Sequence, residues 1–253
     1  MRIIAITAQK GGSGKTTNAL NIGTGLSYLG KKVLLIDMDP QASLTDGLGV
    51  IPEECKRSVA DVLLRKLTIP DVAVKINRNL DLVPASDELT GLEISLADHK
   101  DRNIRLSAAL DRVKAQYDYI IIDCGLKHEL LTVNALAAAD YCIIPVQAHF
   151  LASEGIPDVL EMVRNVQNRF NPDLKIAGIL LTMYQSRPQL CQSVRSSVGE
   201  IYGDSIHVFD RPIEQTIKVA ECPAAGMSIL DYAPKNPAAD SYRSLAQEVL
   251  RLG

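Results

Sequence analysis

The chain has 253 residues, of which 47% are hydrophobic, 4% aromatic and 23% charged, and its formal net charge is −3. This length suffices for one large α/β domain, and the charge excludes a protein that coats nucleic acid with its whole surface, although it leaves room for a local basic patch. The five cysteines are scattered without a Cys-x-x-Cys pair, which favours reduced thiols over a disulfide framework or a zinc site.

Short apolar runs alternate with amphipathic stretches along the chain. The apolar runs predict buried strands at 3–7, 32–37, 80–84, 119–123, 141–146 and 176–183. The amphipathic stretches predict helices at 16–29, 103–116, 130–139, 154–170, 189–201 and 238–252. Such alternation implies right-handed crossovers and a mostly parallel sheet flanked by helices. We therefore predict a single doubly wound α/β domain over residues 1–253.

A glycine-rich segment links the first predicted strand to the first predicted helix. It reads Gln-Lys-Gly-Gly-Ser-Gly-Lys-Thr-Thr over residues 9–17. Glycines let the backbone form a nest whose N–H groups bind phosphate, and the helix start adds positive potential. Lys15 can reach the β- and γ-phosphates, and the Thr16 hydroxyl can coordinate Mg²⁺. A turn without a ligand is the alternative, but this combination predicts a P-loop NTPase with ATP and Mg²⁺ bound at Gly11, Gly12, Ser13, Gly14, Lys15, Thr16 and Thr17.

Acidic residues follow two of the predicted strands. Asp37 and Asp39 come at the end of the second strand, and Asp123 ends the run Tyr-Ile-Ile-Ile-Asp. Open α/β sheets bind ligands at the carboxyl ends of their strands, where carboxylates need a cation or water. We predict that Asp123 holds Mg²⁺ through water. The alternative is a carboxylate that caps a helix or a turn.

These segments resemble the ParA/MinD family of deviant Walker A ATPases. The loop lacks the first glycine of the ordinary pattern and has Lys10 instead, Asp37-Met38-Asp39-Pro40-Gln41 resembles a second family motif, and Ile144-Pro145-Val146-Gln147 resembles a third. The resemblance implies a homodimer joined through the nucleotide face, in which Lys10 reaches the partner's ATP. It also implies that Asp39 orients the attacking water and that Asp37 lies near the Mg²⁺ shell. The alternative for Lys10 is a solvated lysine.

The resemblance extends to a nucleoside pocket and to one departure from the family. Thr182 and Met183 follow the family strand beside adenine, with the loop at Pro212 opposite. After Asp123, relatives have a small residue and then Pro-Pro-Ser, whereas this chain reads Cys124-Gly125-Leu126-Lys127. We expect this loop to sense the γ-phosphate and to be looser without its prolines. An adaptor that holds ATP with little turnover is therefore an alternative function.

Two basic residues match family positions that bind nonspecific double-stranded DNA. These are Arg187 and Lys218, and the surroundings of Lys218 depart from the family pattern. Phosphate contacts of this kind are sequence-independent and sensitive to salt. The alternative is a set of scattered surface charges.

The resemblance implies a ParA-type partition ATPase whose slow hydrolysis is stimulated by a ParB-like or other cargo adaptor. We expect a cytoplasmic protein that associates with the nucleoid in its ATP state. Because the predicted ATPase strand begins at residue 2, we do not expect operator binding through an N-terminal helix-turn-helix. The last residues show no basic amphipathic pattern, so we expect MinD-like positioning on a membrane less than DNA partition. An iron–sulfur reductase would need a second cluster cysteine besides Cys124, and none is evident.

Overall fold

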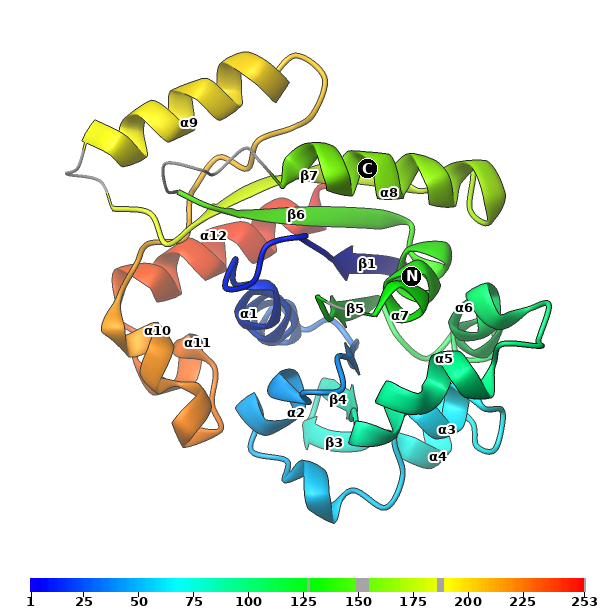
Figure 1. Ribbon diagram of the computed structural model, residues 1–253. Helices are drawn as coiled ribbons and strands as arrows, with labels where there is room; N and C mark the ends of the chain where they lie inside the picture. Colours follow the sequence, from blue (N-terminus) through cyan, green and yellow to red (C-terminus); the bar gives the residue numbers. More distant parts are fainter. Residues whose placement is uncertain (127, 149–154, 186–188, 253) are drawn as a thin grey trace.

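The computed structural model describes residues 1–126, 128–148, 155–185 and 189–252. The described residues form a seven-stranded sheet with helices on both of its faces (Figure 1). Its strands run in the order β3-β4-β2-β5-β1-β6-β7, and every neighbouring pair is parallel except β3 with β4. The strands are β1 (Arg2–Ile6), β2 (Val33–Met38), β3 (Val74–Asn77), β4 (Leu80–Val83), β5 (Tyr119–Cys124), β6 (Tyr141–Gln147) and β7 (Lys175–Thr182). The predicted α/β sheet is thus confirmed.

Long and short helices cover the sheet. The longer ones are α1 (Lys15–Tyr28), α7 (Glu129–Ala138), α8 (Ile156–Arg169), α9 (Gln189–Tyr202) and α12 (Pro237–Leu250). The shorter ones are α2 (Ser43–Gly47), α3 (Val59–Leu63), α4 (Ile69–Val72), α5 (Leu92–Ser95), α6 (Arg105–Leu110), α10 (Ile217–Glu221) and α11 (Ile229–Tyr232). No helix in the described ranges is long and apolar enough to cross a membrane.

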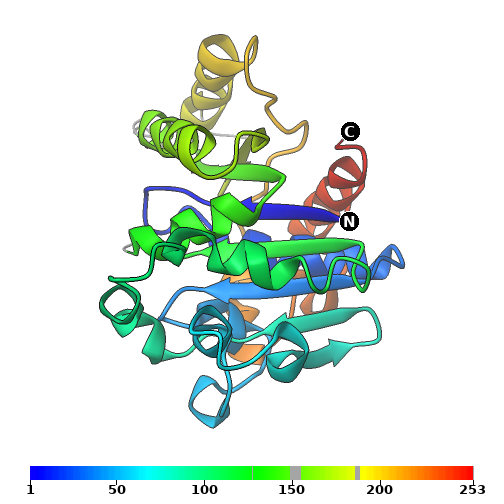
Figure 2. The same cartoon turned by 90° about the vertical axis from the view of Figure 1, so that its right-hand side faces the viewer.

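Two apolar cores result from the period-two alternation of the central strands. In β1, Ile3 packs into the core beneath α3, α6, α7 and α8, whereas Ile4 packs into the core beneath α1, α11 and α12. Successive side chains of a strand point to opposite faces, so both faces of a central strand must be apolar. The two ends of the chain lie close together (Figures 1 and 2), and Arg2 Nη1 donates a hydrogen bond to Leu250 O at 3.0 Å.

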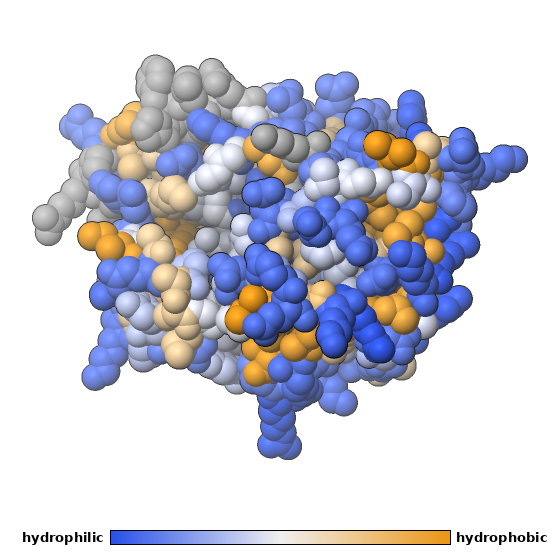
Figure 3. Space-filling view, turned by 60° about the horizontal axis from the view of Figure 1, so that its bottom comes forward, coloured by the Kyte–Doolittle hydropathy of each residue, from blue (hydrophilic) through white to orange (hydrophobic). Residues whose placement is uncertain are grey.

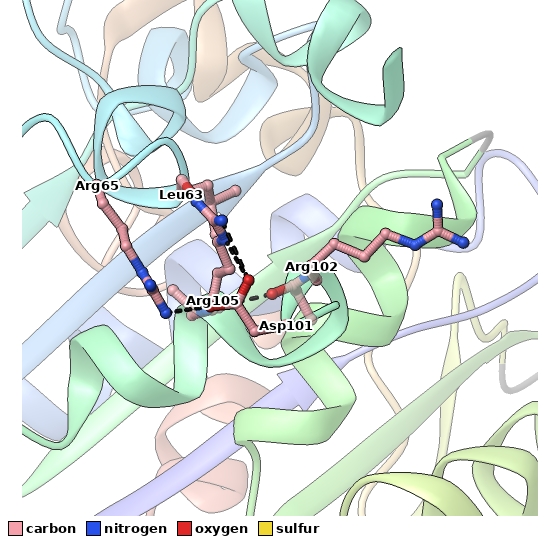
Figure 4. Close-up of polar contacts among 7 residues, drawn as sticks. Leu63, Arg65, Asp101, Arg102 and Arg105 are labelled. Atoms are coloured by element: carbon pink, nitrogen blue, oxygen red, sulfur yellow. Dashed lines mark hydrogen bonds and ion pairs between the residues drawn. The ribbon is translucent and has the colours of Figure 1, made fainter. Parts of the chain in front are cut away.

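A buried arginine fastens α6 to the last residue of α3. Arg105 Nη1 donates to Leu63 O at 3.1 Å, and Arg105 Nη2 donates to Asp101 Oδ1 at 3.1 Å (Figure 4). Arg65 forms an ion pair with the same aspartate. A buried guanidinium requires such compensation, because an unpaired charge in the core is costly. This cluster therefore fixes the helical cover over one face of the sheet.

The structure differs from the sequence-based prediction at a long helix and at an edge strand, and it adds short helices that were not predicted, namely α2, α3, α4, α5, α10 and α11. The helix predicted at 103–116 was wrong beyond Leu110, because residues 111–116 form turns in which Val113 N donates to Leu110 O and Gln116 N to Val113 O. The apolar spacing of Leu106, Leu110 and Val113 suits turns of three residues as well as a helix. Strand β3 was not predicted, since this antiparallel edge strand has no fully buried residue.

Helix α1 approaches α12 so closely at Gly25 that a Cβ there would lie 2.9 Å from Ala246 Cβ. We predict that Gly25→Ala lowers the free energy of unfolding by about 1 kcal/mol, because overpacking exceeds the gain in helix propensity. In the matched control Gly199→Ala, at an exposed position of α9, a Cβ meets no atom within 4 Å. That change should raise stability by roughly 0.5–1 kcal/mol in urea unfolding. Equal shifts of both variants would contradict this packing.

Candidate nucleotide site

The glycine-rich loop between β1 and α1 adopts the conformation of a phosphate-binding nest. Gly12 and Gly14 have φ angles of 72° and 87°, a region that side chains disfavour. Gly14 is the N-cap of α1 and provides no side-chain cap, so no capping side chain competes for the first N–H groups of the helix. Such N–H groups, together with the helix dipole, attract an anion.

Thr182, at the end of β7, holds this loop in place. Its hydroxyl donates a buried hydrogen bond of 2.9 Å to Ser13 O. The side chain of Ser13 is itself buried, and its Oγ has no partner in the described part of the chain. Thr182 was predicted as a neighbour of the base or ribose, and the observed contact gives it a structural role in the phosphate loop as well.

The two lysines of the loop have opposite environments. Lys15 is only 9% exposed and lies near Asp123, whose pKa it lowers. Lys10 is exposed. Within the described ranges, no hydrogen bond or ion pair is formed by the Lys10 ammonium. The buried Lys15 is placed as a contact to the phosphates of its own chain's nucleotide would require. The exposed Lys10 is placed as a contact to the nucleotide of a second chain would require.

Asp123 is a buried carboxylate without a hydrogen-bond partner among the described residues. It is 0% exposed, and neither of its side-chain oxygens accepts a hydrogen bond. Burial and the charge of Asp37 raise its pKa well above the ordinary value, and the nearby Thr16 hydroxyl and Lys15 ammonium offset this only in part. A buried carboxylate with two unsatisfied oxygens fits a cation.

Asp37 lies opposite Asp123 in the register of β2 and β5, but its carboxylate is well satisfied. Its Oδ2 accepts from Thr45 N at 2.9 Å and from Thr45 Oγ1 at 2.8 Å, and its Oδ1 accepts from Asp39 N at 3.1 Å. Burial raises its pKa to about 6, although these hydrogen bonds counteract the shift. Asp37 therefore holds α2 and the Asp39 backbone beside the site.

Asp39 is half-buried at the mouth of the site. Its Oδ1 accepts a hydrogen bond of 3.1 Å from Gln41 N, whereas its Oδ2 accepts none from the described residues. A carboxylate with one oxygen fixed and the other open can orient a water molecule. No group of three or more His, Cys, Asp and Glu in the described ranges is arranged to hold a metal ion, so phosphate oxygens and water would complete a Mg²⁺ shell.

A cavity of about 270 Å³ adjoins the phosphate loop and would suit a nucleoside. It is lined by Gly14, Thr17, Asn18, Thr182, Met183, Ile213, Gln215 and Tyr242, among others. Met183 has a φ of 52° and turns the chain out of β7 at the rim of this cavity. The structure thus brings together the predicted Thr182 and Met183, whereas Ile213 lines the cavity in place of its neighbour Pro212.

Of the two residues predicted to contact DNA, the structure describes only Lys218. Arg187 lies outside the described residues. Lys218 Nζ forms an ion pair with Glu221 Oε2 at 2.8 Å and lies 5.5 Å from the centre of the Tyr232 ring. The Glu221 hydrogen bond raises the pKa of Lys218. Exposed ion pairs of this kind are weak, so Lys218 can exchange its partner for a phosphate.

Thr45, Asn18 and Tyr242 were not predicted as functional, whereas Gly125 belongs to the loop that was expected to sense the γ-phosphate. Thr45 binds Asp37, the Oδ1 of buried Asn18 accepts a hydrogen bond of 2.9 Å from the Tyr242 hydroxyl, and buried Gly125 contacts Asp39. Tyr242 lies 224 residues from Asn18, so no local pattern indicates it, whereas Thr45 lies only eight residues after Asp37 but outside the motif that ends at Gln41. Gly125 carried a signal, since it stands where the family pattern has proline.

The fold and this loop define a P-loop nucleotide-binding protein. A family model described as an AAA domain matches residues 1–176. The chain is 43% identical to the sporulation initiation inhibitor protein Soj of Bacillus subtilis, covering 100% of this chain and 99% of that protein. It is 40% identical to the chromosome partitioning protein ParA of Caulobacter vibrioides, covering 99% and 94%. The chain belongs to the ParA/Soj family of P-loop ATPases, which confirms the resemblance found in the sequence.

Solved structures with bound nucleotide share the fold. A cobyrinic acid a,c-diamide synthase from Mycobacterium smegmatis, with bound ATP analog and magnesium, has a TM-score of 0.88 at 34% identity, covering 99% of this chain and 95% of that chain. A putative plasmid partition protein from Borrelia burgdorferi B31, bound to AMPPNP, has a TM-score of 0.80 at 27% identity, covering 98% of each chain. One scaffold thus carries proteins named for different functions, so function must be argued from the site.

We predict that Thr182→Val weakens binding of MgADP roughly fivefold, since losing a buried hydrogen bond costs about 1 kcal/mol. The valine keeps the shape of the side chain but leaves Ser13 O without this donor. Isothermal titration measures the change. As a control, Thr68→Val alters an exposed threonine on the far loop before α4 and should leave the affinity unchanged. Unaltered affinity in Thr182→Val would show that this bond does not shape the loop.

We predict that in EDTA the Asp123→Asn variant unfolds at a higher temperature than the wild type. Its free energy of unfolding should be higher by about 1 kcal/mol or more. Burial raises the pKa of Asp123, which means that ionising this carboxyl destabilises the folded state. This destabilisation is present at neutral pH, where the carboxyl is ionised in the unfolded chain. The same variant should lose the extra stabilisation that Mg²⁺ adds to bound ADP. Exposed Asp204→Asn is the control. Full retention of the Mg²⁺ effect in Asp123→Asn would exclude Asp123 from the metal site.

Proposed function

We propose that this chain is a dimerising partition ATPase that binds nonspecific DNA in its ATP state. The observation that carries the proposal is the pair of lysines on one loop, with Lys15 turned inward and Lys10 exposed without a partner among the described residues. The family membership and the nucleotide-bound structural neighbours support ATP and Mg²⁺ as its cofactors. Binding would seal Lys10 against the nucleotide of a second chain.

The protein groups divide the work at the bound nucleotide. The nest at Gly12 and Gly14 and the start of α1 bind the phosphates, and Lys15 neutralises their charge. Asp123 and Thr16 would hold the magnesium ion, with Asp37 behind them as the group that positions α2. When bound, Mg²⁺ supplies charge stabilisation for phosphoryl transfer.

Hydrolysis is slow in this proposal, because the site holds few groups that act on the attacking water. Asp39 orients that water through its open Oδ2. The described residues of one chain place no arginine at the phosphate loop to act as a finger in cis, so Lys10 of a second chain supplies the missing positive charge. A ParB-like or other cargo adaptor then stimulates turnover by completing or tightening the dimer site.

DNA binding rests on a limited set of cations. Lys218 lies on the short helix α10, whose neighbour Val219 lines the nucleoside cavity, so nucleotide binding and the DNA surface share one helix. The face over α2, β3 and α4 is mainly hydrophilic, with small separate apolar patches (Figure 3). Among its described residues, this face therefore offers no broad apolar patch for docking another protein.

We predict that DNA binding requires ATP, falls steeply as salt is raised, and is lost in Lys10→Ala. The titration uses a fluorescent duplex of arbitrary sequence, with ATP, ADP or no nucleotide, at two salt concentrations. Lys32→Ala is the matched control, because Lys32 is also exposed but precedes β2 at the opposite edge of the sheet. Sedimentation of the same samples reports the dimer.

Each outcome of this titration has a distinct meaning. If the protein dimerises with ATP but does not bind DNA, the DNA-binding part of the proposed function is refuted. That result would favour a positioning ATPase that acts on another surface. A dimer that forms without measurable phosphate release would favour a nucleotide-dependent adaptor. Lys10→Ala that dimerises and binds DNA as the wild type does would refute the role of Lys10 across the interface.

A further inference from the structure

The register of the two central strands brings Gly125 to Asp39. Asp37 pairs with Asp123 and Met38 with Cys124, so Asp39 and Gly125 are the residues that directly follow two adjacent parallel strands. Both strands end here, at the edge of the sheet where the phosphate loop lies. Gly125 is buried, whereas Asp39 is half-buried. Backbone geometry alone therefore places this glycine against the carboxylate that we assign to the attacking water.

There is no room for a side chain between the two residues. A Cβ on Gly125 would lie 3.0 Å from Asp39 Cγ and 3.3 Å from each of its two carboxylate oxygens. Such distances are shorter than ordinary van der Waals contact, so the carboxylate would have to move by a few tenths of an ångström. The φ angle of Gly125 lies outside the left-handed region, so glycine is needed here for space and not for backbone conformation.

The geometry of this contact determines which hydrogen-bonding directions of the Asp39 carboxylate stay open. The missing Cβ is equidistant from Oδ1 and Oδ2 and closer to Cγ, so Gly125 faces the flat side of the carboxylate. Hydrogen bonds to a carboxylate lie near its plane. The in-plane directions are therefore not blocked by Gly125, and Gln41 N donates a hydrogen bond to Oδ1 at 3.1 Å. Oδ2 is left for water.

We propose that Gly125 is a positioning residue for ATP hydrolysis, because its lack of a side chain lets the Asp39 carboxylate lie flat against the loop after β5. This inference rests on the proposed role of Asp39 in the function above. It gives the Gly125 loop a specific steric role, since the loop sets the place of the hydrolytic carboxylate while nucleotide binding depends on other residues.

The main experiment compares Gly125→Ala with the wild type in steady-state phosphate release. We expect kcat to fall roughly three- to tenfold, since displacing a catalytic group by a fraction of an ångström costs rate steeply. KM and the affinity for MgADP should stay unchanged, because the phosphate nest and the nucleoside cavity are not touched. Gly91→Ala is the matched control: Gly91 is exposed, and a Cβ there meets no atom within 4 Å.

Thermal unfolding tests the contact itself and does not depend on turnover. With Asp39 present, Gly125→Ala should lower the melting temperature by about 2–4 °C relative to the wild type. This is the shift expected when overpacking lowers the free energy of unfolding of a chain of this size by roughly 1 kcal/mol. In an Asp39→Ala background the carboxylate is gone, so the same substitution should cause no such loss. If Gly125→Ala fails to fold alone, its folding in the Asp39→Ala background still supports the contact, and failure in both refutes it.

The outcomes separate this inference from the proposed function. Wild-type kcat in Gly125→Ala, together with an inactive Asp39→Ala, would overturn the role of Gly125 alone. Wild-type turnover in Asp39→Ala would overturn the role of Asp39 and with it the whole inference. A rise in KM that accounts for the lost rate would show that Gly125 acts on nucleotide binding instead.

Discussion

The site depends on the parallel pairing of β2 with β5. That pairing sets Asp37 opposite Asp123 and carries both strands to the same edge of the sheet, beside the phosphate loop. Two buried carboxylates this close are costly, and the protein resolves the cost unequally. Asp37 receives three hydrogen bonds and supports α2, whereas Asp123 receives none from the described residues and stays poised for a cation. The two carboxylates thus differ: Asp37 is bound within the protein, and Asp123 is left free for the role of metal ligand that we propose.

The same pairing links the site to the rest of the fold. Thr45 Oγ1 donates to Asp37 and also accepts from Ala85 N at 3.1 Å, so one hydroxyl joins the ends of β2 and β4 to α2. On the other side of the loop, Thr182 ties Ser13 to the end of β7. The end of β7 therefore braces the nest through Thr182, whereas Thr45 fixes the strand ends that carry the carboxylates on the other side of β1.

Sequence patterns predicted most of this arrangement and missed a definable part. Apolar periodicity locates the six parallel strands, because both faces of the sheet are buried and the runs are unbroken. The glycines and Lys15 locate the phosphate nest, since such a loop must lie between a strand and a helix. Edge strand β3 lacks a buried face, so periodicity does not reveal it. Tyr242 lies 224 residues from Asn18, and Thr45, although only eight residues after Asp37, lies outside the local motif, so motifs do not reveal these partners.

Gly125 shows how a departure from a family pattern acquires meaning from the structure. The sequence suggests a looser loop where relatives have proline, because glycine has more backbone freedom than proline. The structure shows a buried glycine whose missing side chain is replaced by the face of the Asp39 carboxylate, so at this position close packing and not freedom distinguishes glycine from larger residues. A residue with any side chain at this position would require a different place for Asp39, which means that residues 39 and 125 constrain each other.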